Sequence, residues 1–241
     1  MRFSTALSCN NFWRRELNYL HQIATIAWKD LISEFRSRDT VLSMLVFCLL
    51  VVVIFSFTFD PGSTYAKEAA PGILWVAFTF SGMLGLNRTF SQEVDTGSIH
   101  GVLLAPLDHG AIYLGKMIGS FVFMFLVELI TLPAIIVFFD LNLENHYLQL
   151  FTIILLATIG FVSVGTLFSA MTVHTKTREL MLPILLFPVM IPVIISAVNA
   201  TSSILNLEEW ERIFGWIRIL LAFDIVFITV SYLTFGYVVE E

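Results

Sequence analysis

Three ionisable side chains interrupt long apolar stretches of the sequence, and they are the first candidates for chemistry. They are Glu128, Arg218 and Asp224, each flanked on both sides by mostly apolar residues. A charged side chain at the centre of a membrane helix costs roughly 2.5–3.5 kcal/mol on insertion scales, so each should face protein or water. One interpretation is a structural ion pair, either Glu128–Arg218 or Arg218–Asp224. The other is a carboxyl group that binds a substrate or a proton, for which we favour Glu128.

A second candidate is a near-match to a nucleotide-binding loop at Gly110–Met117, with the sequence GAIYLGKM. A Walker A loop follows a strand and ends in Ser or Thr, whose hydroxyl binds magnesium. Here the final Ser or Thr is missing, no strand is predicted before the segment, and it continues directly into an apolar stretch. We interpret the match as coincidence and predict that the chain is not an enzyme and has no ATPase activity of its own.

The histidines and cysteines do not form a metal-binding pattern. No two of the five histidines have metal-ligand spacing with supporting carboxylates, and the two cysteines lie in unrelated settings. His100 and His109 share a polar segment with Glu93, Asp95 and Asp108, which leaves a hydrolase or transferase site as an alternative. We favour a solvated segment that contacts a partner protein, and we predict no directly bound metal or cofactor.

The composition places the chain in the membrane. Of 241 residues, 57% are hydrophobic and only 13% are charged, and the mean hydropathy is +0.85. Ordinary soluble domains carry about 25% charged residues. The net charge of −6 argues against binding nucleic acid, which requires a basic surface.

Six stretches are long and apolar enough to cross a bilayer, which requires about 20 mostly apolar residues. The predicted spans are Val41–Phe59, Ala70–Leu86, Ala111–Phe139, Tyr147–Met171, Leu180–Ala200 and Ile213–Val239. Of the 13 Lys and Arg residues, ten lie in or beside the N-terminal segment and the second and fourth loops. The opposite side has the remaining three, Lys67, Arg212 and Arg218. The excess of positive charge predicts that both termini are cytoplasmic.

The segment before the first span has the pattern of an amphipathic helix. Apolar residues recur every three or four positions from Trp13 to Phe35, with charged residues between them. We expect this helix to lie along the cytoplasmic membrane interface, with its basic residues toward anionic lipid. The alternative is a soluble helix packed on the loops. The chain then divides into an N-terminal cytoplasmic segment, 1–40, and a six-helix transmembrane domain, 41–239.

A short polar segment between the second and third spans, 88–110, is the clearest candidate for a partner contact. Gly97 can end one helix, Ser98 can cap the next, and Pro106 stops it. A small capped helix between two spans is well placed for another protein to displace. The candidate contact residues are Glu93, Asp95, Gly97, Ser98, Ile99, His100, Val102 and Leu103, with a second contact at Lys176, Arg178 and Glu179.

The fifth predicted span contains three prolines. Pro183 is compatible with a helix start, whereas Pro188 and Pro192 each remove a backbone hydrogen bond in the middle of the span. The pattern predicts a bent or partly unwound helix. It does not distinguish a hinge from a fixed kink.

With six spans, an interfacial N-terminal helix and a capped helix in the second loop, the chain resembles the membrane subunits of ABC-2 type transporters. More narrowly, it resembles the heme exporter protein B (CcmB) family, over nearly the whole chain from Trp28. The most specific parts are APGILWVA at 70–77, the run 88–106 with its Gly97-Ser98, Lys116 at the start of the third span, and FPVMIP at 187–192. One departure is TGSIH at 96–100, where the family usually has Asp-Gly-Ser-Leu-Glu.

The resemblance implies a permease subunit in the bacterial inner membrane that serves c-type cytochrome biogenesis. The implied partners are a cytosolic ATP-binding subunit (CcmA-like), a heme-handling membrane subunit (CcmC-like) and a heme chaperone (CcmE-like), with two copies of this chain. ATP would be bound by the first partner. The chain lacks a tryptophan-rich heme segment, and its five tryptophans never stand side by side. We therefore expect heme to be held by a partner.

In this interpretation the ATP-binding subunits displace the Gly97–Leu104 helix. Ile99, Val102 and Leu103 would fill an apolar groove on the ATPase, and Glu93 and Asp95 would meet basic groups. The alternatives are an ABC-2 permease for a lipid, polysaccharide or drug, and an ion-coupled secondary carrier using Glu128 and Asp224.

Overall fold

The computed structural model describes residues 3–59, 63–95, 108–143, 146–173, 175 and 177–240, with side chains from residue 19 onward except at 37, 89, 90, 92–95 and 240. Within these residues all regular secondary structure is α-helical, as predicted. The helices are α1 Phe3–Ser37, α2 Asp39–Thr58, α3 Thr64–Asp95, α5 His109–Phe138, α6 Tyr147–Thr172, α7 Arg178–Leu205 and α8 Trp210–Glu240.

The six predicted spans are confirmed as six helices long and apolar enough to cross a membrane: α2, α3, α5, α6, α7 and α8. Most of the predicted ends lie within three residues of the observed ones. The exceptions are α3, which extends into polar sequence at both ends, and α7, which continues through Thr201 and Ser203 to Leu205. Backbone hydrogen bonds continue a helix whatever the polarity of its side chains, so hydropathy underestimates such helices.

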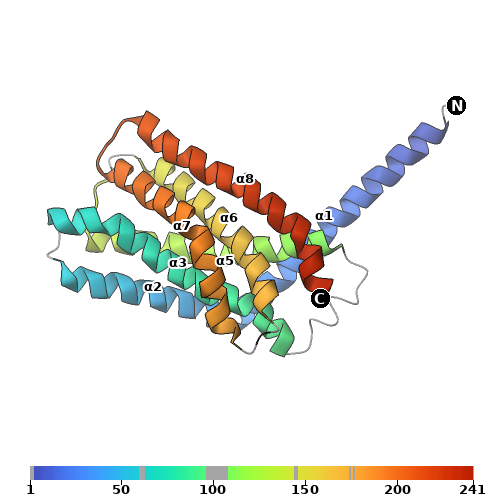
Figure 1. Cartoon of the computed structure of the whole chain (residues 1–241), viewed down its shortest axis with the longest axis horizontal. Helices are drawn as coiled ribbons and strands as arrows, with labels where there is room; N and C mark the ends of the chain where they lie inside the picture. Colours follow the sequence, from blue (N-terminus) through green and yellow to red (C-terminus); the bar gives the residue numbers. More distant parts are fainter. Residues whose placement is uncertain are drawn as a thin grey trace.

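The helices form an elongated bundle (Figure 1). The ends of α2, α5 and α7 lie at its left end together with the starts of α3, α6 and α8, whereas the C-terminus lies at the other end. The N-terminal half of α1 extends away from the bundle on the side of the C-terminus (Figure 1). This arrangement agrees with the prediction that both termini lie on the same side of the membrane.

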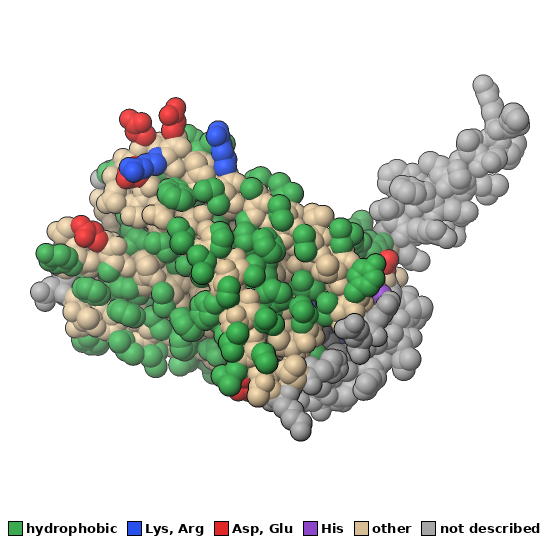
Figure 2. Space-filling view, viewed as in Figure 1, with side chains coloured by type: hydrophobic (Ala, Val, Ile, Leu, Met, Phe, Trp, Pro, Cys, Tyr) green, Lys and Arg blue, Asp and Glu red, His purple; other side chains and the backbone are tan. Residues whose placement is uncertain are grey.

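α6 is the central helix of the bundle. It contacts α3, α5, α7 and α8, and 72% of its most apolar stretch is buried, compared with 22% for α2. Small residues let its neighbours approach closely: a Cβ atom at Gly165 would collide with Leu86 of α3. Hydrophobic side chains cover the middle of the outer face seen in Figure 2, and the charged side chains in view lie toward its edges.

α7 is helical without interruption from Arg178 to Leu205, although it contains Pro183, Pro188 and Pro192. The expectation of a partly unwound segment is therefore not met. Pro188 and Pro192 are exposed on the surface of the bundle. Whether α7 acts as a hinge stays a prediction.

Candidate coupling interface and intramembrane carboxyl groups

The predicted partner contact between the second and third spans is framed by two helix ends. α3 remains helical to Asp95, so Glu93 and Asp95 belong to its last turn. α5 begins at His109, where the Asp108 side chain accepts a hydrogen bond from the Gly110 N–H (2.8 Å). The intervening candidates lie outside the described residues: Gly97, Ser98, Ile99, His100, Val102 and Leu103.

The second predicted contact lies at the start of α7. Arg178 is the first residue of this helix and Glu179, which is exposed, the second. Lys176 is outside the described residues. The exposure of Glu179 is compatible with contact to a partner protein.

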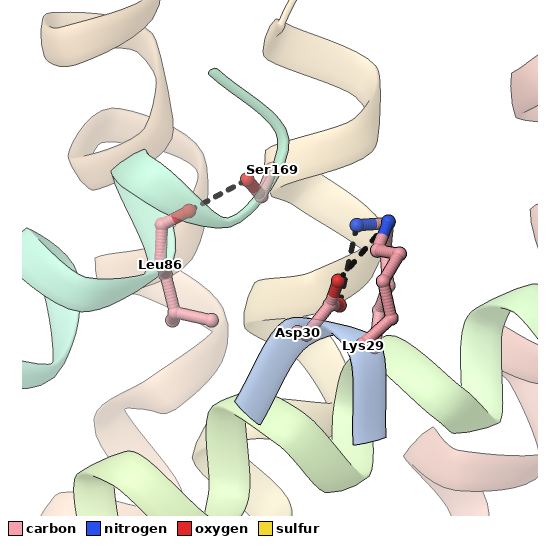
Figure 3. Close-up of polar contacts among 5 residues, drawn as sticks. Lys29, Asp30, Leu86 and Ser169 are labelled. Carbon is pink, nitrogen blue, oxygen red and sulfur yellow. Dashed lines mark hydrogen bonds and ion pairs between the residues drawn. The ribbon is translucent and has the colours of Figure 1, made fainter. Parts of the chain in front are cut away.

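The start of α5 is clamped to α1 by an ion pair. Lys116 is 1% exposed, and its Nζ lies 3.4 Å from Oδ2 of Asp30. Asp30 also forms an ion pair with Lys29, whose Nζ lies 3.2 Å from Oδ1 of Asp30. Figure 3 shows this pair. The close approach of the two helices depends on glycine, because a Cβ at Gly115 would lie 2.7 Å from Cβ of Ile26. The clamp ties α5 to the helix that precedes the first span.

α1 and α5 run parallel where they touch, so that later residues of α1 contact later residues of α5. The Gln22 side chain accepts from the backbone N–H of Asp108 (3.5 Å), and farther along the pair Phe35 meets Phe123 with ring centroids 5.9 Å apart. A helix that merely crossed α5 would contact it at one place only. The C-terminal half of α1 therefore packs lengthwise on α5.

Glu34 links α1 to the first span. It is buried, and its Oε1 accepts hydrogen bonds from the backbone N–H groups of Thr40 (2.8 Å) and Val41 (3.2 Å) at the start of α2. These donors have no partner inside the helix, and a carboxylate also interacts favourably with a helix N-terminus. α1 is thus attached to α2 and α5 by two acidic side chains that point into the protein.

Sequence reasoning missed this clamp. It used Lys116 for orientation and for the family resemblance, and it treated the charged residues of α1 as a lipid-facing or solvated set. The available signal was the G-x-x-x-G spacing of Gly115 and Gly119, which often marks a close helix–helix contact.

The cytoplasmic part of α3 is tied to α6. Ser169 Oγ donates a hydrogen bond of 2.8 Å to the backbone oxygen of Leu86, both of which are labelled in Figure 3. Deeper in the bundle, Ser81 Oγ donates to the Met44 oxygen of α2 (3.1 Å). A displacement of the end of α3 would thus reach both α6 and α2.

Glu128 lies inside the bundle and is 1% exposed. Thr158 Oγ1 of α6 is 2.6 Å from its Oε2, whereas Oε1 has no hydrogen-bond partner among the described residues. The expected Glu128–Arg218 pair does not form.

Arg218 and Asp224 also lie apart. The Arg218 guanidinium is 4.4 Å from the ring centroid of Phe214, one turn away on the same helix, α8. Asp224 is 5% exposed, and neither carboxyl oxygen has a partner among the described residues. It packs against Gly160 of α6, where a Cβ would lie 2.5 Å from its Oδ1. The alternative Arg218–Asp224 pair is therefore also absent.

The two carboxyl groups flank α6. Thr158 contacts Glu128 and Gly160 contacts Asp224, and the two residues are two positions apart on α6. They therefore lie on different faces of this helix. In the described part of the chain, no group of three or more His, Cys, Asp and Glu side chains is arranged to hold a metal ion. The candidate site therefore has two parts. At the cytoplasmic end, several helices are connected by polar contacts. On either side of the central helix α6 lies a separate buried carboxyl group.

Comparison with known proteins shows which family the sequence resembles. The family described as CcmB protein matches residues 21–240. The chain is similar to heme exporter protein B of Shigella flexneri, with 30% identity over 185 residues, 75% of this chain and 83% of the relative. It is also similar to the heme exporter protein B of Pseudomonas aeruginosa, with 27% identity over 172 residues, 71% of this chain and 77% of the relative. For that of Rhodobacter capsulatus the identity is 30% over 151 residues, 63% and 69% of the two chains.

Proposed function

This chain belongs to the CcmB protein family, and from that premise we propose that it is the permease subunit of an ABC transporter complex for heme export or delivery in c-type cytochrome biogenesis. The observation that carries the proposal is the family match over 21–240, which covers all six spans. Relatives that match most of the chain carry the name heme exporter protein B. The complex would lie in the bacterial inner membrane.

Within this complex, ATP hydrolysis takes place on a separate cytosolic subunit of the CcmA kind. Heme is handled by a membrane subunit of the CcmC kind and passed to a chaperone of the CcmE kind. Two copies of this chain would match a dimer of ATP-binding subunits. The role of this chain is to convert movement of the ATPase into movement of membrane helices, without binding heme or ATP itself.

The coupling would begin at the segment between α3 and α5. Closure of the ATPase dimer displaces this segment, and the attached helix ends carry the motion into the membrane. α3 passes it to α6 through Ser169, and α5 passes it to α1 through Lys116 and Asp30. ATP can drive the change only if the ATPase contacts differ between the two states.

The experiment that tests the function is deletion of the gene, followed by heme staining for c-type cytochromes. We expect the stained cytochromes to disappear and to return when the wild-type gene is supplied. Normal cytochromes in the deletion strain would refute the proposal and favour an ABC-2 permease for another substrate.

The coupling role has its own test. Glu93→Lys with Asp95→Lys, or Leu103→Asp, should abolish stimulation of the partner's ATPase by this chain while leaving membrane insertion intact. Charge reversal at Glu209, exposed before α8, provides a control that should keep full stimulation. Unchanged stimulation in the first set of variants would exclude the segment as the coupling element.

A further inference from the structure

The contact between α5 and α6 contains one hydrogen too few if Glu128 is ionised. Thr158 Oγ1 lies 2.6 Å from Glu128 Oε2 and 2.7 Å from the backbone oxygen of Ile154. Both distances are those of hydrogen bonds, but a threonine hydroxyl has a single hydrogen. An ionised carboxylate and a carbonyl oxygen are both acceptors only, so one of the two short contacts would have no hydrogen in it.

The neighbouring polar side chains do not supply the missing hydrogen. Thr131 Oγ1 donates to the Val127 oxygen at 2.6 Å, one turn back on α5. Cys48 of α2, which lies close to Thr131 and within electrostatic range of Glu128, directs its thiol to the Ala77 oxygen at 3.4 Å. Ser81 of α3, beside Cys48, donates to the Met44 oxygen. Each of these hydrogens is already directed at a backbone carbonyl.

Among the described residues, no cation compensates Glu128 either. The helices packed against α5 are α1, α2, α3, α6 and α8. On α1, Asp30 is paired with Lys116, which lies three turns from Glu128 along α5. α1 also carries Tyr19, His21, Lys29, Glu34 and Arg36 among its described side chains. The described titratable or charged groups on the other packed helices are Asp39 and Cys48 on α2, Tyr65, Lys67, Glu68 and Arg88 on α3, Tyr147 on α6, and Glu211, Arg212, Arg218, Asp224, Tyr232 and Tyr237 on α8. Arg218 is engaged with Phe214, and Asp224 is packed on Gly160.

We propose that Glu128 is a proton-binding site in the middle of the membrane bundle. With a proton on Oε2, the carboxylic acid donates to Thr158 Oγ1, and Thr158 donates to the Ile154 oxygen. Each of the two short contacts then contains one hydrogen, and no uncompensated charge is buried between the helices. The proton thus holds α5 to α6 through a neutral hydrogen bond.

The site gives the bundle a contact that depends on one proton. If α5 and α6 separate, water can enter and accept the proton from the acid as hydronium, leaving a carboxylate. The two helices cannot re-form the same contact until a proton returns. Proton binding at Glu128 does not depend on which substrate the complex transports.

Infrared spectroscopy of the full chain in lipid nanodiscs at neutral pH tests the proposal. A carboxylic-acid C=O band is expected in the wild type, and it should be lost in Glu128→Gln. Asp224→Asn is the matched control, because it replaces a second buried carboxyl group in the same bundle and should leave the Glu128 band in place. Loss of a carboxylate band from Glu128→Gln, with no change in the carboxylic-acid region, would overturn the proposal.

If Glu128→Gln does not fold, a second pair of variants tests whether a protonated Glu128 is hydrogen-bonded to Thr158. Thr158→Val removes the hydroxyl and should move the C=O band to the higher frequency of an acid without its hydrogen-bond acceptor. Thr158→Ser keeps the hydroxyl and should leave the band where it is. A band that both variants leave unmoved would show that no acid–hydroxyl bond joins α5 to α6.

Discussion

Two carboxyl groups of this bundle, one partly buried and one fully buried, are accommodated in different ways. Asp30, which is 18% exposed, lies near the cytoplasmic end and meets the ammonium group of Lys116. Glu128, three turns deeper along α5 than Lys116, is 1% exposed, and its one hydrogen-bond partner among the described residues is the hydroxyl of Thr158. Near water an acid and a base can keep their charges and pair. In the centre of the bundle no cation of the described residues reaches the acid, and the partner is a neutral group.

The comparison teaches that burial of a charged side chain does not by itself predict its partner. Lys116 and Glu128 belong to the same helix and are both almost completely buried. The first faces the charged side chain of α1, whereas the second faces α6, which carries no acidic or basic residue between Tyr147 and Thr172. The neighbouring helix determines whether an ion pair is possible.

Breaking the ion pair should have the largest effect on stability. Lys116→Met removes the buried cation of Asp30, which keeps the half-exposed Lys29, and we expect a loss of roughly 3 kcal/mol, the low end of the range for removing one partner of a buried pair. The thermal unfolding midpoint of the purified chain in detergent measures it. Lys116→Met combined with Asp30→Asn should recover most of the loss. Wild-type stability in the single variant would show that the clamp is not a stabilising contact.

At Glu128 the same comparison predicts a split between two substitutions. Glu128→Ala removes buried atoms and the partner of Thr158, and should cost about 2–3 kcal/mol, as do other large-to-Ala changes in well-packed sites. Glu128→Gln retains the shape and a neutral hydrogen bond, and should cost no more than about 1 kcal/mol. Unfolding of both variants under the same conditions measures the difference. A loss in Glu128→Gln as large as in Lys116→Met would mean that Glu128 has a cationic partner.

The second intramembrane carboxyl group can be tested through the glycine that it faces. Gly160→Ala places a methyl group 2.5 Å from Asp224 Oδ1, and overpacking of this kind costs about 1–3 kcal/mol. Asp224→Ala in the same chain removes the collision, so the double variant should be more stable than the sum of the single effects predicts. Gly215→Ala is a matched control, because a Cβ there meets nothing within 4 Å. Strict additivity would contradict the observed packing.

The smallest effect is expected at Arg218. Its guanidinium lies over Phe214 on an exposed side of α8, and an exposed cation–π contact contributes about 0.5–1 kcal/mol. Arg218→Gln should therefore lower stability by no more than that amount. The same unfolding assay can detect a larger loss, which would indicate that Arg218 pairs with a carboxyl group after all.

The limits of sequence-based prediction are clear at particular residues. The six spans could be predicted because each is a long apolar run, but α7 was ended too early, because Thr201 and Ser203 look polar although both are buried. One interpretation of the sequence paired Arg218 with Glu128 or Asp224, because a charge in a span needs compensation. That rule gives the need for a partner but not its identity, and the partner of Glu128 is a threonine.

The sequence by itself determined that this chain is an all-helical membrane protein with six spans and both termini on one side. Hydropathy and the distribution of Lys and Arg decide these properties, and both can be summed along the chain. The tertiary structure alone decided that Lys116 meets Asp30, 86 positions away, and that Glu128 meets Thr158, 30 positions away. Such partners depend on how each helix is rotated and which helix lies beside it, and these are set by packing across the whole bundle.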